Sequence, residues 1–237
     1  MDDQARLGTW VGDYTPPPRP VGAVMQGRFV RLERLDADTH AADLHRAYLG
    51  HDGLWDYMPY GPFPSASGYH RWAKETASGT DPLFHVLRDV VTGRAGGVAS
   101  DLRIAPEAGS IEVGHICIAP ELSRSPASTE AMMLMMDWAF SNGYRRYEWK
   151  CNALNLPSRR AAQRLGFSYE GIFRQHLISK GRNRDTAWFA VIDTDWPALR
   201  EAFAAWLAPA NFDAAGRQRE RLSDLTGLVR VARTPGL

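Results

Sequence analysis

Apolar and polar residues change their spacing several times in the first half of the chain, and each change predicts an element. The first segment mixes apolar and charged residues as a strand does, and the next two have helical spacing. Three apolar runs then follow, separated by turn sequences, which is typical of an antiparallel meander. The expected elements are a strand at 28–35, helices at 39–49 and 67–78, and strands at 83–90, 95–104 and 110–118.

The second half alternates helical and strand patterns. In residues 126–142, Ala131, Leu134, Met135 and Trp138 form one helical stripe. The remaining elements are a strand at 144–151, a helix at 157–165 and a hairpin of strands at 167–179 and 184–193. A strand, a helix and a strand in succession imply a parallel pair. The expected fold class is α/β (α+β), with a mixed, mostly antiparallel central sheet flanked by helices.

Three regions are expected along the 237 residues. Residues 1–27 include the proline-rich "YTPPPRPVG", which favours an extended arm. Residues 28–195 contain all the strand patterns and form the main domain. Residues 196–237 are expected to form a helical extension, with helices in "WPALREAFAAWL" and "AAGRQRERLSDL". These helices are candidates for the contact of a homodimer or for the docking of a partner.

Composition narrows the class of protein. Hydrophobic residues make up 44% and charged residues 23% of the chain, as in globular proteins, and the formal net charge is +1. This charge gives no basic field for nucleic acid or an anionic membrane. No apolar run suits a signal peptide or a membrane span. The only cysteines, Cys117 and Cys151, fit no metal motif. We therefore expect a cytoplasmic protein with reduced thiols and no metal.

The stretch "ELSRSPASTEA" (121–131) connects an expected strand to an expected helix. A turn at a helix N-terminus binds phosphate through backbone N–H groups and the helix dipole. Such turns are usually rich in glycine, and this one has none. Ser125 is a good N-cap and Pro126 a good first helical residue, so the stretch read alone is a well-capped helix start.

Two longer stretches carry a family resemblance. "EVGHICIAPELSRSPASTEA" and "CNALNLPSRRAAQRLGF", together with the order of elements, resemble the GNAT superfamily of acyl-CoA-dependent N-acetyltransferases. The resemblance covers residues 28–193 and is strongest to the branch of ribosomal-protein N-terminal acetyltransferases. It implies that the parallel strands splay apart and that acetyl-CoA is the co-substrate.

The pyrophosphate motif of that superfamily is Arg/Gln-x-x-Gly-x-Gly/Ala. By resemblance it starts at Arg124, with Ala127 and Thr129 at the glycine positions. Because the anion is bound by backbone N–H groups, these positions require only small side chains. The resemblance implies a phosphate site formed by Arg124, Ser125, Ala127, Ser128 and Thr129, in which the hydroxyls of the last two can add donors.

The resemblance also assigns residues to the rest of the cofactor. The backbone from Ile116 through Ile118 would contact pantetheine and the thioester. Asn155 and Ser158 match the family's Asn-x-x-Ser, so that the amide would bind pantetheine and the hydroxyl would serve the departing sulfur. Alternatively, both residues only cap the helix that follows. Many GNAT enzymes use a tyrosine as the acid, but this segment has none.

Glu112 and His115 are the candidate bases on the central strand. Strict alternation predicts that they face opposite sides of the sheet. Family members often use a carboxylate here through a water molecule, which favours Glu112. A lone histidine in a strand is more often a hydrogen-bonded core residue, but its ordinary pKa near neutrality keeps His115 as the second candidate.

The acceptor pocket is expected beneath the loop "LWDYMPYGPF". Its rings offer large apolar faces with polar tips, although they could equally form a cluster that covers the core. Arg174 and His176 on the late hairpin could add polar contacts. The wall residues expected from this loop are Trp55, Tyr57, Tyr60 and Phe63.

The resemblance implies an acetyl-CoA-dependent N-acetyltransferase that acts by direct transfer in a ternary complex. Two acceptors stay open, a protein or peptide α-amine and a small-molecule amine. The alternative is a protein that is not an enzyme, a module that binds acyl-CoA and does not turn it over.

Overall fold

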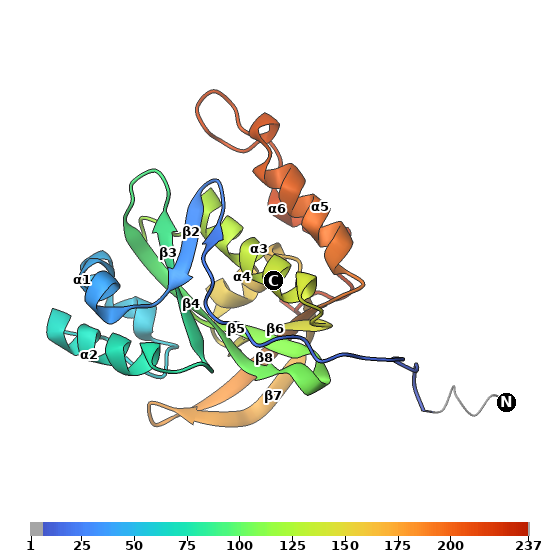
Figure 1. Ribbon diagram of the computed structural model, residues 1–237, viewed down its shortest axis with the longest axis horizontal. Helices are drawn as coiled ribbons and strands as arrows, with labels where there is room; N and C mark the ends of the chain where they lie inside the picture. Colours follow the sequence, from blue (N-terminus) through green and yellow to red (C-terminus); the bar gives the residue numbers. More distant parts are fainter. Residues whose placement is uncertain (1–6, 237) are drawn as a thin grey trace.

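An eight-stranded sheet forms the centre of the computed structural model, which describes residues 7–236 (Figure 1). Its order is β1-β2-β3-β4-β5-β6-β8-β7, and only β5 and β6 run parallel. The strands are β1 (Met25–Gln26), β2 (Val30–Arg34), β3 (Leu83–Asp89), β4 (Ala95–Ala105), β5 (Ser110–Ile118), β6 (Arg146–Asn152), β7 (Ser168–Ser179) and β8 (Arg182–Ile192). The predicted fold class is confirmed.

Helices connect and flank these strands. The α-helices of the described residues are α1 (Ala37–Tyr48), α2 (Ala66–Ala77), α3 (Pro126–Ser141), α4 (Leu156–Arg164), α5 (Trp196–Leu207) and α6 (Leu222–Thr226). Short 3-10 turns add η2 (Asp52–Trp55), η3 (Pro106–Ala108) and η4 (Pro209–Asn211). Up to β8, the predicted order of strands and α-helices is confirmed, with one strand added at the start, β1.

The charged stretch "AAGRQRERLSDL" does not form the helix that was predicted. Only its end is helical, in α6, and Gly216 has a left-handed φ of +74°. The Asp213 carboxylate accepts hydrogen bonds from the backbone N–H groups of Ala215 and Arg217, both at 2.9 Å. An aspartate that binds nearby backbone groups stabilises a turn against a helix, which explains the difference.

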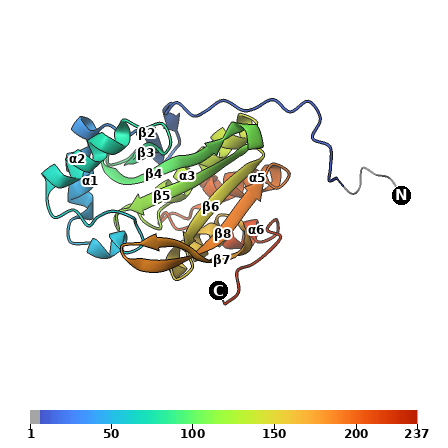
Figure 2. The ribbon, with the colours of Figure 1, turned by 90° about the horizontal axis from the view of Figure 1, so that it is seen from below.

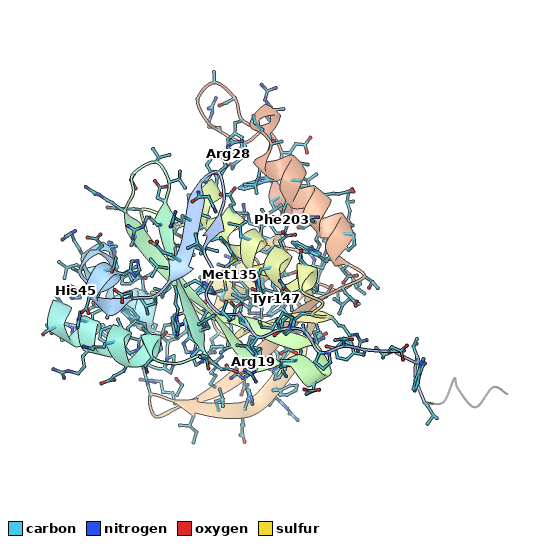
Figure 3. All side chains as sticks on the ribbon, viewed as in Figure 1. Arg19, Arg28, His45, Met135, Tyr147 and Phe203 are labelled. Atoms are coloured by element: carbon cyan, nitrogen blue, oxygen red, sulfur yellow. The ribbon has the colours of Figure 1, made fainter. Side chains whose placement is uncertain are left out.

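The two faces of the sheet bury separate cores. Helices α1 and α2 cover one face with an aromatic-rich cluster. The other face packs against α3, α4 and α5, which lie across the sheet from α1 and α2 (Figures 1 and 2). Met135, Tyr147 and Phe203 are fully buried in this second core and bring together α3, β6 and α5 (Figure 3).

The C-terminal region packs against the main domain. Trp196 at the start of α5 stacks on Phe140 of α3, with ring centroids 5.2 Å apart. Further on, Thr234 is buried, and its hydroxyl accepts a 2.6 Å hydrogen bond from the Arg159 guanidinium of α4. The tail therefore stabilises α4, whose first turn includes Ser158.

From Tyr14 to β1 the N-terminal arm lies along the sheet, whereas the described residues before it extend away from the domain (Figures 1 and 2). The Tyr14 hydroxyl donates to the carbonyl of Pro106 at 2.8 Å, and the Arg19 guanidinium donates to the carbonyl of Ile104 at 3.0 Å. Where the arm enters β2, the buried Glu130 carboxylate accepts hydrogen bonds from three successive N–H groups, those of residues 28–30. This carboxylate joins the start of the main domain to α3.

Candidate active site

The parallel strands β5 and β6 separate halfway along their length. They pair only from Ser110–Val113 to Arg146–Trp149, although β5 continues to Ile118 and β6 to Asn152. A cleft of about 310 Å³ occupies this region, lined by both strands, the start of α4, loop residues 57–59 and hairpin residues 177–179. Beyond Val113, β5 has no partner strand on the β6 side among residues 7–236, and Gly114, His115 and Ile116 of this stretch line the cleft. Ile118 lies outside the cleft lining, and the Cys117 carbonyl accepts a 2.9 Å hydrogen bond from the Tyr48 hydroxyl.

A bulge in β5 shapes the wall of this cleft. Val98 and Ser100 are two residues apart on β4, whereas their partners Cys117 and Gly114 are three apart on β5. His115 is within the bulge and has a left-handed φ of +50°. An extra residue in one strand reverses the alternation of the side chains that follow it.

The prediction that Glu112 and His115 face opposite sides is therefore wrong. Val113 and Ile116 pack on the same core beneath α3, although they are three residues apart, and Cys117 packs in the opposite core. Both Glu112 and His115 line the cleft. The bulge places the two candidate bases together.

Ser158 and Asn155 lie at the start of α4 and also line the cleft. The Asn155 side chain caps the helix and accepts a 3.1 Å hydrogen bond from the N–H of Ser158. The Ser158 oxygen accepts a 3.0 Å hydrogen bond from the indole N–H of Trp149. Trp149 thus orients the hydroxyl through its oxygen. Burial raises the pKa of the neighbouring Cys151 thiol, and a hydrogen bond from the Ser158 hydroxyl opposes this rise.

Ser125 caps α3 as predicted, and Pro126 is the first helical residue. The Ser125 hydroxyl oxygen accepts a 3.2 Å hydrogen bond from the N–H of Ser128. Within residues 7–236, the N–H groups of Arg124, Ser125 and Ala127 donate to no acceptor. Three unpaired N–H groups and the positive end of the helix dipole are features of an anion site.

The hydroxyls of Ser128 and Thr129 do not add donors to this site, in contrast to what their sequence positions suggested. Both hydroxyls donate to the carbonyl of Ser125, at 2.9 and 3.4 Å. The Arg164 guanidinium of α4 donates to the Thr129 hydroxyl at 3.0 Å. Arg164 therefore brings a second cation near the start of α3, in addition to the exposed Arg124.

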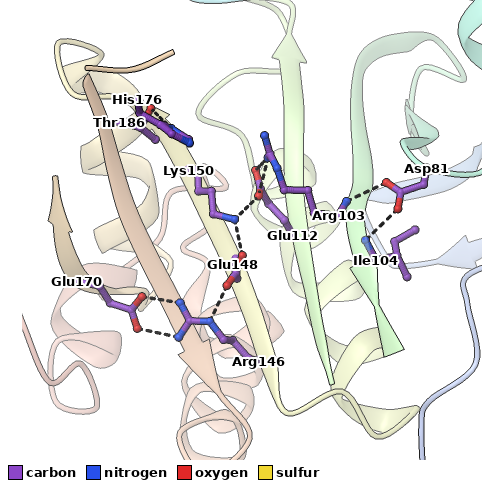
Figure 4. Close-up of polar contacts among 10 residues, drawn as sticks. All are labelled: Asp81, Arg103, Ile104, Glu112, Arg146, Glu148, Lys150, Glu170, His176 and Thr186. Carbon is purple, nitrogen blue, oxygen red and sulfur yellow. Dashed lines mark hydrogen bonds and ion pairs between the residues drawn. The ribbon is translucent and has the colours of Figure 1, made fainter. Parts of the chain in front are cut away.

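A row of charged side chains crosses the strands at the cleft (Figure 4). Cations and carboxylates alternate along it in the order Arg103, Glu112, Lys150, Glu148, Arg146 and Glu170. The Glu112 side chain is only 3% exposed, and its carboxylate accepts hydrogen bonds at 2.8 Å from both Arg103 and Lys150. The Asp81 carboxylate in turn accepts from the N–H groups of Arg103 and Ile104. Glu112 is therefore a fixed carboxylate between two cations.

His115 lies under the aromatic loop. Its ring stacks on Tyr60 with an interplanar angle of 8°, and the Tyr60 hydroxyl is 2.9 Å from Nδ1. This contact joins His115 to the aromatic loop. Burial, together with Arg103 and Arg184, lowers the pKa of His115 to about 4. At neutral pH the ring is uncharged.

We expect His115 to make the stability of the protein depend on pH. The folded state has the lower pKa, about 4 against an ordinary 6.5, so between these values the unfolded chain binds more protons. Stability therefore falls as pH falls from 6.5 to 4, by about 3 kcal/mol in total. His115→Asn should lose less stability over this range, and Asn tolerates the left-handed backbone. Urea unfolding at pH 7 and 4.5 measures this difference, and an equal loss in both proteins would contradict it.

The predicted acceptor residues divide into two groups. Tyr57 lines the cleft, and its hydroxyl donates to the carbonyl of Leu154 at 3.2 Å. Tyr60 contacts His115. Trp55 and Phe63 lie outside the cleft lining, in the aromatic cluster that covers the α1–α2 core. These two rings therefore form part of a cluster that covers the core, which was the alternative to a pocket wall.

The hairpin of β7 and β8 lines the cleft with residues other than those predicted. Arg174 lies outside the cleft, in a shallow depression of about 680 Å³ that contains no predicted catalytic residue. His176 also lies outside the cleft lining, with Nδ1 3.0 Å from the Thr186 hydroxyl. Lys180 joins the hairpin to the aromatic loop, because its ammonium donates to the carbonyls of Trp55 and Gly61.

The family model of the acetyltransferase (GNAT) domain matches residues 30–168 of the sequence. The chain belongs to the GNAT acetyltransferase family. A GCN5-related N-acetyltransferase from Brucella melitensis is 44% identical, with a TM-score of 0.89 over 91% of this chain and 99% of that one. A probable GNAT acetyltransferase from Chromobacterium violaceum ATCC 12472 is 35% identical, with a TM-score of 0.76 over 81% of this chain and 96% of that one.

A more distant GNAT structure is the ribosomal L7/L12 alpha-N-protein acetyltransferase RimL. It is 19% identical, with a TM-score of 0.62 over 75% of this chain and 99% of that one, and this likeness shows the fold alone. No curated protein matches the sequence. The family predicted from the two motifs is confirmed.

GNAT enzymes use acetyl-CoA as co-substrate, and residues at the start of α3 and in the cleft fit this molecule. The unpaired N–H groups at the start of α3 suit its phosphates, and the open edge of β5 suits the amides of its pantetheine arm. Among the described residues, no group of side chains is arranged to bind a metal ion. No helix within residues 7–236 is long and apolar enough to span a membrane. Both cysteines are buried free thiols.

Several residues of this GNAT site were not among those predicted from the sequence. Trp149 fits the expected apolar face of its strand, but its contact with Ser158 depends on how α4 packs on β6. Lys150 could have been placed near Glu112, because a parallel pair of these strands was predicted. Arg103 and Arg184 required the complete strand order.

Proposed function

We propose that this protein transfers an acetyl group from acetyl-CoA to a primary amine, with both molecules bound at the cleft at the same time. The observation that supports this most directly is the separation of β5 and β6. One cleft joins Ser158 and Asn155 on α4 to Glu112 and His115 on β5. Residues suited to a thioester and residues suited to an amine thus line the same space.

Acetyl-CoA supplies an activated acetyl thioester. In this proposal, the N–H groups of Arg124, Ser125 and Ala127 bind its phosphates. The backbone of β5 from Ile116 to Ile118 orients the pantetheine arm, and the side chain of Asn155 lies beside it. The Asn155 amide oxygen already accepts from the N–H of Ser158, so its NH₂ group is the part free to donate.

Two proton transfers are assigned to residues of the cleft. As the amine nitrogen bonds to the thioester carbon and the C–S bond breaks, the Ser158 hydroxyl, held by Trp149, donates a hydrogen bond to the leaving thiolate, or gives it a proton and takes one back from water. Glu112 accepts the proton of the amine through a water molecule. His115 is the second candidate, because a ring whose pKa is lowered to about 4 is a weak base at neutral pH. The cations around the cleft lower the pKa of a bound ammonium group and so favour the reactive neutral amine.

The acceptor is either a small-molecule amine or the N-terminus of a peptide. RimL acts on the α-amine of a ribosomal protein, but its likeness to this chain extends only to the fold. Within this proposal, the cleft of about 310 Å³ accommodates the reacting end of either acceptor.

Arg124→Ala tests the proposed phosphate site. Arg124 is exposed beside three unpaired N–H groups, and we expect its loss to remove one charge-assisted contact to phosphate. The expected cost is about 1.5–3 kcal/mol, or roughly ten- to a hundredfold in CoA affinity. Calorimetry measures this affinity, with Arg71→Ala on the exposed face of α2 as the matched control. Equal CoA affinity in Arg124→Ala and the parent would overturn the assignment.

Release of free CoA from acetyl-CoA tests the proposed activity. A panel of small amines and peptides with free N-termini is incubated with the protein, and mass spectrometry identifies the acetylated product. We expect stoichiometric CoA release and N-acetylation for at least one amine. A module that only binds acyl-CoA would bind CoA in calorimetry and release no thiol with any amine.

A further inference from the structure

The charged side chains of the cleft indicate the chemical class of the acceptor amine, which the proposed activity does not specify. Three cations line the cleft, Arg103, Lys150 and Arg184, against a single carboxylate, that of Glu112. The first two cations are bonded to this carboxylate. Arg184 on β8 makes no ion pair and no side-chain hydrogen bond with any residue in 7–236, and its Nε is buried without an acceptor.

An unpaired guanidinium in such a position is costly. A partly buried charge without a partner loses hydration that nothing replaces. Burial lowers the pKa of Arg184, with Arg103 adding to the effect and Cys151 and Glu112 opposing it. Its five N–H donors match the oxygens of a carboxylate or a phosphate. The site therefore lacks an anion, and the chain does not supply one from the described residues.

From these observations we infer that the acceptor amine carries an anionic group, a carboxylate or a phosphate, which Arg184 binds in the cleft. This inference rests on the proposed function and assigns the substrate class. A polyamine is a poor fit, because no carboxylate lining the cleft is free of a cation.

The phosphates of acetyl-CoA do not supply this anion. Ala127 at the start of α3 packs in the core on one face of the sheet, as do Ala187 and Phe189 of β8. Trp188 of β8 has the opposite orientation, and its ring packs against the ammonium of the cleft residue Lys150 at 4.0 Å. Arg184 has the same parity as Trp188 and lines the cleft. Arg184 and the α3 phosphate site are therefore on opposite faces of the sheet.

A second source of the same chemistry is an anionic acyl group, such as that of succinyl-CoA. This group would enter the cleft from the α4 side, where Ser158 lies, and could also reach a guanidinium. The acceptor and the acyl group are distinguished by varying them separately in the experiment.

The experiment uses matched amines in the presence of CoA. The panel contains amino acids, the same amino acids as neutral C-terminal amides, aminoalkyl phosphates and the corresponding diamines. Calorimetry measures their binding to the full chain, so the result does not depend on turnover. We expect the carboxylate or phosphate members to bind at least about tenfold more tightly than the matched amides and diamines.

Variants of Arg184 assign the preference to this residue. In Arg184→Gln the preference for anionic members is expected to disappear, and in Arg184→Lys a weaker preference should remain. Arg182→Gln is the matched control, because Arg182 is an exposed arginine of the same strand that does not line the cleft. Melting curves test whether each variant folds. If Arg184→Gln does not fold, Arg184→Lys takes its place in the comparison.

Three results would overturn the inference. Equal binding of anionic and neutral members is one, and an unchanged preference in Arg184→Gln is another. The third is more rapid use of succinyl-CoA than of acetyl-CoA that depends on Arg184, which would place the anion on the acyl group. Release of CoA with neutral amines alone would contradict this inference and support the proposed activity, so the two are tested separately.

Discussion

Ser158→Ala is expected to lower kcat by roughly ten- to a thousandfold, within or just below the range of general-acid catalysis. The Ser158 oxygen is held by the Trp149 indole, so the hydroxyl has a fixed position in the cleft. Its contact with the leaving sulfur strengthens only as negative charge develops there. A loss confined to the transition state lowers kcat and leaves the affinity for CoA nearly unchanged. Steady-state kinetics and calorimetry on the same preparation measure both quantities.

Asn155→Ala is the comparison for Ser158→Ala. The Asn155 side chain caps α4, so its removal is expected to cost about 1 kcal/mol of stability. It should also raise the KM for acetyl-CoA, because its proposed contact exists before the reaction begins. Melting curves for both variants separate loss of the cap from loss of catalysis. A folded Ser158→Ala protein with full turnover would remove Ser158 from the catalytic residues.

Glu112→Gln is expected to lower kcat/KM by roughly a hundred- to ten-thousandfold, the range of general acid–base catalysis. The glutamine keeps the size of the side chain and removes the proton acceptor from the cleft. The same change leaves Arg103 and Lys150 without their shared carboxylate, so stability is expected to fall by about 3 kcal/mol. Kinetics at a temperature where the variant is folded measure the catalytic effect.

Glu148→Gln controls for the loss of ion pairs. Glu148 lies in the same charged row and bonds two cations, Lys150 and Arg146, but it does not line the cleft. Its substitution should lower stability by a comparable amount and leave kcat within a fewfold of the parent. If both variants lost activity equally, the charged row would act only by supporting the structure, and the base would have to be found elsewhere.

Local signals in the sequence were sufficient for much of the fold. The hydrophobic spacing predicted the strand order of the meander and the parallel pair, because each depends on short segments. The caps of α3 and α4 were also predictable, since Ser125 and Asn155 act within a single helical turn. The family resemblance came from these same segments, which contain the turn before α3 and the start of α4.

Features that depend on neighbouring strands could not be predicted in this way. The bulge at His115 is defined by its register with β4, and a simple period of two placed Glu112 on the wrong face relative to it. The charged row depends on which strands are neighbours in the sheet. That Arg184 has no partner depends on which groups surround it in the folded protein. In each case, tertiary packing decides what the local pattern leaves open.

The most direct test of the central claim is a crystal structure of the protein with CoA. Pantetheine is expected to lie between the separated ends of β5 and β6, with the thiol sulfur within hydrogen-bonding distance of the Ser158 hydroxyl. The pyrophosphate is expected to accept hydrogen bonds from the N–H groups of Arg124, Ser125 and Ala127. CoA bound outside this cleft, or with its sulfur directed away from Ser158, would contradict the proposed mode of binding.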